Sequence, residues 1–204
     1  TLSFIMVMLF VVLGFSLKVM AAEEELYKTL TFNSTTMQTS ISEYNKTWET
    51  KVGEDTWSIA NANNNNKGWT YIKMGSNKAA YVGAISTEFA IDKPVTKVVM
   101  TVDAVTTTSI NSVKLYVASD SAFANKLETV SATVQTGAVT FAISNPVANA
   151  YYKIEVDCKK ASSNGPITIS KVEYYASLGD TSNIEAVKEE LNNEEVVAKF
   201  ANTT

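Results

Sequence analysis

Between Leu26 and Tyr175 the sequence alternates apolar and polar side chains with a spacing of two residues. A β-strand directs successive side chains to opposite faces, so this spacing predicts strands. In segment 97–105, for example, Val98 and Met100 fall on one face and Thr101 on the other. Asn, Asp, Gly, Ser and Pro interrupt the alternation at short intervals, and no helical pattern intervenes. The region is therefore expected to contain roughly nine or ten short strands.

Short strands separated by turns every few residues are typical of an all-β fold, here an antiparallel β-sandwich. A jelly roll is favoured over an immunoglobulin-type sandwich, because the chain has a single cysteine, Cys158, and lacks the paired-cysteine signature. Cys158 falls on the apolar face of its strand, and the chain has no histidine to activate it. It is therefore expected to be a small buried hydrophobic residue and not a reactive thiol.

The alternation places strands at particular segments and leaves others as loops. Segment 33–51 is polar and is not expected to form a strand, and the Asn-rich segment 61–68 is expected to be a loop that tolerates left-handed backbone angles. In the last strand the apolar positions change parity, which predicts a bulge near Ser170. The expected strands are 26–32, 57–59, 69–74, 79–90, 97–105, 113–118, 128–134, 139–143, 151–158 and 167–175.

The two ends of the chain do not follow this pattern. Residues 1–21 are mostly apolar and end in small residues before an acidic run, which predicts a signal peptide whose basic n-region is missing. The alternative is a membrane anchor, but the apolar run is shorter than the roughly 20 residues that span a bilayer. Residues 22–176 are expected to form the sandwich. Residues 177–204 contain a capping box at Ser182 and are expected to be a linker helix towards a missing domain.

Composition narrows the classes of function. The formal net charge is −4, so there is no basic footprint for nucleic acid. The chain has no histidine, which removes the commonest general base and most zinc sites. Its acidic residues are scattered, and no spacing singles out a glycosidase-type carboxylate pair. We therefore expect a noncatalytic, secreted protein with no cofactor and no stable membrane insertion after signal cleavage. A structural calcium ion is the one metal that the sequence leaves open.

Aromatic and amide side chains cluster around the Asn-rich loop. Sugar rings stack on aromatic faces, and their hydroxyl groups match amides that both donate and accept hydrogen bonds. The alternative is that these aromatic residues belong to the core, as is usual for Trp on a sandwich strand and is favoured for Trp57. The candidate ligand-binding residues are Trp48, Asn64, Asn66, Trp69 and Tyr71.

Three segments carry a resemblance to a known family. They are Asp55-Thr56-Trp57-Ser58-Ile59, the loop 63–68 with the following Trp69-Thr70-Tyr71-Ile72-Lys73-Met74-Gly75, and the stretch 163–175 that begins Ser163-Asn164-Gly165-Pro166. Together they resemble the galactose-binding-like jelly-roll modules, similar to carbohydrate-binding modules, of secreted gut-bacterial multidomain proteins. The resemblance covers about residues 25–176 and implies an adhesive or carbohydrate-binding appendage beside further domains of the same polypeptide. It supplies no catalytic motif.

Two hypotheses about function follow. The first is an extracellular binding module whose partner is a glycan or a cell-surface component. The second is a structural spacer or assembly domain of a larger extracellular protein with no small ligand and with all its aromatic residues in the core. Exposure of Trp48 or Trp69 beside a concave, Asn-lined surface would favour the first hypothesis, and their burial would favour the second.

Overall fold

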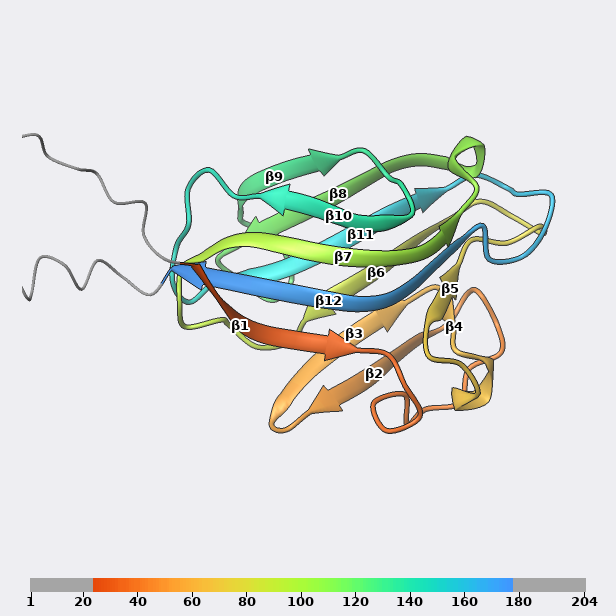
Figure 1. Ribbon diagram of the computed structural model, residues 1–204, viewed down its shortest axis with the longest axis horizontal. Helices are drawn as coiled ribbons and strands as arrows, with labels where there is room; N and C mark the ends of the chain where they lie inside the picture. The colour runs from red at the N-terminus through yellow and green to blue at the C-terminus, as the bar shows by residue number, and fades with distance from the viewer. Residues whose placement is uncertain (1–23, 178–204) are drawn as a thin grey trace, which may run out of the picture.

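The computed structural model describes residues 24–177, which form two antiparallel sheets of six strands each, packed face to face (Figure 1). This confirms the predicted all-β sandwich. The first sheet contains β1 (Glu24–Thr31), β4 (Ala62–Asn63), β5 (Ile72–Met74), β7 (Val95–Val105), β10 (Gly137–Ala142) and β12 (Ile167–Ser177). The second sheet contains β2 (Thr47–Val52), β3 (Asp55–Ala60), β6 (Tyr81–Thr87), β8 (Ile110–Ala118), β9 (Lys126–Ala132) and β11 (Tyr151–Cys158).

The strand order shows how the chain is wound. The first sheet runs β10-β7-β12-β5-β4, with β1 also paired to β12, and the second runs β2-β3-β6-β11-β8-β9. From β6 onward the chain passes between the sheets at nearly every connection: β7 lies in the first sheet, β8 and β9 in the second, β10 in the first, β11 in the second and β12 in the first. This repeated crossing is how a jelly roll is wound.

The core lies between the two sheets and is built by the alternation along the strands. In β11 every second residue is buried, from Tyr152 to Cys158, while the residues between them are partly exposed. Trp57 from the second sheet is fully buried, as predicted, and its ring meets Phe89 edge to face at a centroid distance of 4.9 Å. Each large apolar side chain buried in this way contributes about 1.5–3 kcal/mol to stability.

The polar segment 33–51 contains a strand that the sequence did not predict. Residues 47–52 form β2, which pairs with β3 over its whole length. Only Trp48 and Thr50 are buried in this strand, and the other four residues are exposed. Two inward side chains among charged and polar neighbours give too weak an alternation to identify a strand from sequence, and pairing with β3 determines the structure instead.

The Asn-rich segment also differs in detail from the prediction. It contains the two-residue strand β4 and a 3-10 turn, η1 (Asn65–Lys67), while Asn61, Asn65 and Asn66 have the expected positive φ angles. A second 3-10 turn, η2 (Thr107–Ser109), precedes β8. The strand predicted at 69–74 is limited to β5, residues 72–74, which pairs with β12 on one side and β4 on the other.

The last strand confirms the predicted bulge. The register of β12 against β7 shifts between Ile169 and Lys171, so Ser170 is the unmatched residue. The strand continues to Ser177. The predicted signal peptide, residues 1–21, and the helix predicted from Ser182 lie outside the described residues. Within residues 24–177, no helix combines the length and the apolar character needed to cross a membrane.

The burial of Cys158 leads to a chemical prediction. The residue is fully buried, as the sequence predicted, and burial raises the pKa of its thiol to about 12. The thiol therefore stays protonated at neutral pH, and the thiolate is the reactive form. We expect iodoacetamide to leave the folded protein unmodified at pH 8 and to modify Cys158 fully in guanidinium chloride, as measured by mass spectrometry. Fast modification of the folded protein would contradict this.

Three polar atoms in the core lead to a second prediction. The Trp57 Nε1, the Tyr152 hydroxyl and the Tyr174 hydroxyl are buried, and none of them makes a hydrogen bond of normal geometry, although Trp57 lies beside the Tyr174 hydroxyl and the Val95 backbone beside that of Tyr152. An unpaired buried polar group costs about 1–3 kcal/mol. We expect Tyr174→Phe to keep or raise the free energy of unfolding, because its ring still meets Tyr152, at a centroid distance of 5.8 Å. Tyr174→Ala should lower it by about 3–5 kcal/mol, as measured by urea denaturation. A Phe variant as unstable as the Ala variant would contradict the assignment.

Candidate functional site

Trp48 does not serve as a ligand platform. Its side chain is only 4% exposed, its ring meets Phe32 edge to face, and its indole Nε1 donates a hydrogen bond of 2.9 Å to the Ala62 carbonyl. The prediction that Trp48 contacts a ligand is therefore wrong. The physical reason is that β2 turns Trp48 inward, into the core cluster that also contains the fully buried Met37 of segment 33–46.

The two candidate amides of the Asn-rich loop have different positions. Asn64 is fully buried, and both ends of its side-chain amide bind backbone groups: its Oδ1 accepts from the Ile41 and Lys67 amides at 2.9 and 3.4 Å, and its Nδ2 donates to the Thr39 carbonyl. Asn64 therefore cannot contact a ligand directly, and that prediction is wrong. Asn66 is exposed with φ 54°, and it remains a candidate.

Asn63 and Asn64 together hold the loop 38–44 against the first sheet. The backbone N–H of Asn64 also donates to the Ile41 carbonyl at 3.0 Å, and the side-chain Nδ2 of Asn63 donates to the Ser42 carbonyl at 2.5 Å. Burial raises the pKa of Tyr44, and the Asn63 side chain, which lies near the Tyr44 hydroxyl, opposes this rise. We call these contacts the amide clamp. Its consequence is that Tyr44 has a fixed position at the surface.

Trp69 and Tyr71 form an aromatic pair at the surface. Both side chains are partly exposed, and their rings are stacked, with centroids 5.2 Å apart and planes inclined by 22°. The Lys73 Nζ lies 4.4 Å from the Trp69 ring centroid and 5.8 Å from that of Tyr71. Ile72 and Met74 are buried, so the alternation along β5 turns Tyr71 and Lys73 outward. Of the predicted ligand-binding residues, these two aromatic residues are the ones brought together.

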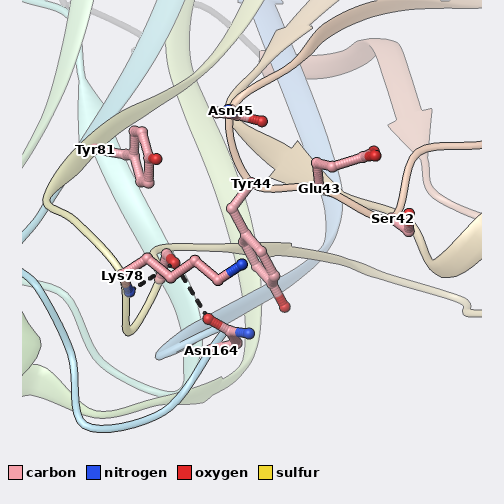
Figure 2. A pocket seen from close by; sticks show the side chains of 8 residues that line it. Ser42, Glu43, Tyr44, Asn45, Lys78, Tyr81 and Asn164 are labelled. Atoms are coloured by element: carbon pink, nitrogen blue, oxygen red, sulfur yellow. Dashed lines mark hydrogen bonds between the residues drawn. The ribbon is translucent and has the colours of Figure 1, made fainter.

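A pocket of 230 Å³ lies at the same end of the sandwich. It is formed by the loop before β2, the loop between β5 and β6, the first residue of β6, and the loop between β11 and β12 (Figure 1). Its lining residues are all of polar types, and the two tyrosine rings add apolar surface. The lining residues are Ser42, Glu43, Tyr44, Asn45, Ser76, Lys78, Tyr81 and Asn164 (Figure 2).

Hydrogen bonds orient the polar groups of this pocket. The Asn164 Oδ1 accepts from the Ser76 hydroxyl at 3.2 Å and from the Asn77 amide at 3.0 Å. The Ser76 Oγ in turn accepts from the Lys78 amide at 3.1 Å. Figure 2 shows the Lys78 side chain extending towards the Tyr44 ring. With the Asn164 oxygen engaged, its Nδ2 is left as a donor, as is the Lys78 ammonium group.

The pocket and the aromatic pair are neighbours. Tyr44 lines the pocket and lies near Tyr71, so that repulsion between the two ionised phenolates adds to the rise in the pKa of Tyr44 that burial causes. On the other side, a Cβ placed on Gly165 would lie 2.6 Å from the Lys73 Cδ, so the Lys73 stem crosses this glycine, next to Asn164. Gly165 has φ +69°, which favours glycine. We call the pocket together with Trp69, Tyr71 and Lys73 the loop-end site.

The loop-end site has the chemistry of a binding surface. It offers two stacked rings, two further tyrosines, amide and hydroxyl groups, and two lysines. In the part of the chain that the structure describes, no three side chains of His, Cys, Asp or Glu come together as a metal-binding group. Sequence reasoning missed Tyr44, Lys78, Tyr81 and Asn164, although the turn residues Asn164-Gly165-Pro166 identified a loop at that position.

Comparisons with known proteins give little further information. No protein-family model matches the chain, and no curated protein matches it. Among solved structures, the chain is similar to TmCBM27, a carbohydrate-binding module that recognises mannan, with 13% sequence identity and a TM-score of 0.40 over 76% of this chain and 99% of that one. At this identity and TM-score, the likeness assigns neither a family nor a ligand to this chain.

The amide clamp can be tested through stability. Asn64→Ala leaves the Ile41 amide and the Thr39 carbonyl without their partners, so we expect a loss of about 2–3 kcal/mol in the free energy of unfolding and faster amide hydrogen exchange in residues 38–44. The matched control is Asn66→Gly, at an exposed position where glycine tolerates the left-handed backbone. The control should leave both measurements unchanged. Equal effects of the two substitutions would contradict the clamp.

Proposed function

We propose that this protein is a secreted, noncatalytic module that binds carbohydrate through the loop-end site. The observation that carries the proposal is the stacked Trp69–Tyr71 pair beside a polar pocket with two tyrosines. The apolar C–H face of a sugar ring packs on an aromatic ring, while its hydroxyl groups need donors and acceptors of the kind that Asn164, Ser42 and Tyr44 provide. On this proposal the partner is a glycan or another component of a cell surface, and further domains of the same polypeptide accompany the module.

The geometry separates the roles of the residues. Trp69 and Tyr71 would hold one face of a sugar, and Tyr44, Tyr81 and Asn164 would surround a neighbouring group. Asn63 and Asn64 would act as positioning residues, because they hold the loop that carries Tyr44. Asn66 lies in the loop that precedes Trp69 and would be a peripheral contact.

A spacer or assembly domain is the second candidate function. It is favoured by the burial of Trp48 and Trp57, since two of the three tryptophans serve the core. Under this alternative, Trp69 would be an ordinary exposed aromatic residue, and its substitution would change no binding property. The two candidate functions therefore predict different effects of removing the Trp69 or Tyr44 side chain. A binding module should lose glycan affinity, and a spacer should show no change.

The test is a glycan-array screen of the purified chain with single substitutions. We expect binding to at least one glycan, and we expect Trp69→Ala and Tyr44→Ala each to reduce affinity at least about tenfold, because truncation of a central aromatic contact costs about 2 kcal/mol or more. Affinities would be measured by calorimetry on the glycan found.

A matched control is Tyr175→Ala, on β12. Tyr175 also carries a lysine over its ring, with the Lys97 Nζ 4.6 Å from the centroid, but it lies at the other end of β12 from Asn164 and Gly165. It should leave affinity unchanged. Absence of binding to every glycan would favour the spacer, and unchanged affinity in both the Trp69 and Tyr44 variants would place the binding site elsewhere.

A further inference from the structure

We infer that the pocket of the loop-end site takes a sugar that bears a carboxylate group, such as a hexuronate, with Lys78 as its principal cation. This inference rests on the proposed function and names its ligand class. The pocket retains several polar groups that its internal hydrogen bonds do not use. Two of these groups, the Lys78 ammonium group and the Asn164 Nδ2, can only donate, and together they suit a ligand group that only accepts.

The unused donors are fixed by the network around Ser76. The Asn164 Oδ1 accepts two hydrogen bonds, one from the Ser76 hydroxyl and one from the Asn77 amide, so the amide orientation is set and the Nδ2 remains as the free end. The Ser76 Oγ already accepts from the Lys78 amide. Figure 2 shows the Lys78 ammonium group beside the Tyr44 ring and the Asn164 amide nitrogen below that ring. A carboxylate accepts from both kinds of donor.

The cations of this site lack acidic partners. The ion pairs between described residues involve Lys28, Lys93, Lys97, Lys153 and Lys171. Neither Lys73 nor Lys78 belongs to such a pair, and the Lys73 ammonium group lies over the Trp69 and Tyr71 rings. The loop-end site is therefore locally cationic, although the whole chain has a net charge of −4.

One acidic residue lines the pocket, and its position is compatible with an anionic ligand. Figure 2 shows the Glu43 carboxylate directed away from both Lys78 and Asn164. The overall negative charge also matters, because it repels polyanions from the rest of the surface. An acidic glycan bound by this chain must therefore be recognised locally, at the unpaired lysines.

The experiment uses an array of acidic oligosaccharides that end in galacturonate, glucuronate or sialate, each beside its carboxyl-reduced counterpart. Reduction removes the charge and keeps the stereochemistry. Neutral and sulfated oligosaccharides complete the array. We expect the purified chain to bind at least one carboxylated sugar about tenfold more tightly than its reduced counterpart, since a charge-assisted hydrogen bond contributes about 1.5–3 kcal/mol. Higher salt should reduce this difference.

Lys78→Gln tests the role of the cation. It should remove the preference for the carboxylated sugar, so that the carboxylated sugar and its reduced counterpart bind with similar affinity. The matched control is Lys126→Gln, which removes the same charge from β9 at the opposite end of the sandwich, where Lys126 faces Ala118. Both positions are exposed, and thermal unfolding of each variant would verify that the fold is intact.

The outcomes separate the inference from the proposed function. Equal binding of a carboxylated sugar and its reduced counterpart would overturn the inference and leave glycan binding in place, and so would a preference that persists in Lys78→Gln. A preference for sulfated over carboxylated sugars would also overturn it, because the ligand class would then be a sulfate ester. Absence of binding to every glycan would overturn the proposed function, and the inference with it.

Discussion

A buried side-chain amide that must find hydrogen-bond partners organises the loop end of this molecule. Asn64 is fully buried, and an amide buried without partners would cost several kcal/mol. It finds them in the backbone of residues 39 and 41 and in its own 3-10 turn. The loop that supplies these partners also carries Tyr44, so satisfaction of the amide fixes one wall of the pocket. The geometry of the site thus depends on a residue that no ligand can touch.

The alternation of side chains was sufficient to predict most of the sandwich. It placed the strands from β7 to β12 and the bulge at Ser170, because a sheet with one face in a core requires a spacing of two residues, and a change of parity requires an extra residue. It failed for β2, where only Trp48 and Thr50 face inward. A strand at the edge of a sheet is specified by its partner more than by its own sequence.

The candidate site could be predicted only in part, for a similar reason. The stack of Trp69 and Tyr71 lies near β5 in the sequence, and composition near the Asn-rich loop was enough to suggest it. Tyr44, Lys78 and Asn164 come from three loops far apart in the sequence, and only the crossing of strands between the sheets brings them together. Trp48 and Asn64 are of the residue types expected in the site, but both are buried. Their burial depends on what packs over the side chain and not on its chemistry.

Exposure of an aromatic residue does not by itself distinguish a binding module from a spacer. The alternation in β5 would turn Tyr71 and Lys73 outward in either case, since Ile72 and Met74 must face the core. The orientation of Asn164 is more informative. Its oxygen is held by Ser76 and Asn77, and its nitrogen faces the same pocket as the Lys78 ammonium group. Packing of the sandwich gains nothing from two unused donors that converge on one exposed pocket, whereas a ligand with an acceptor group does. This convergence favours a binding function over a purely structural one.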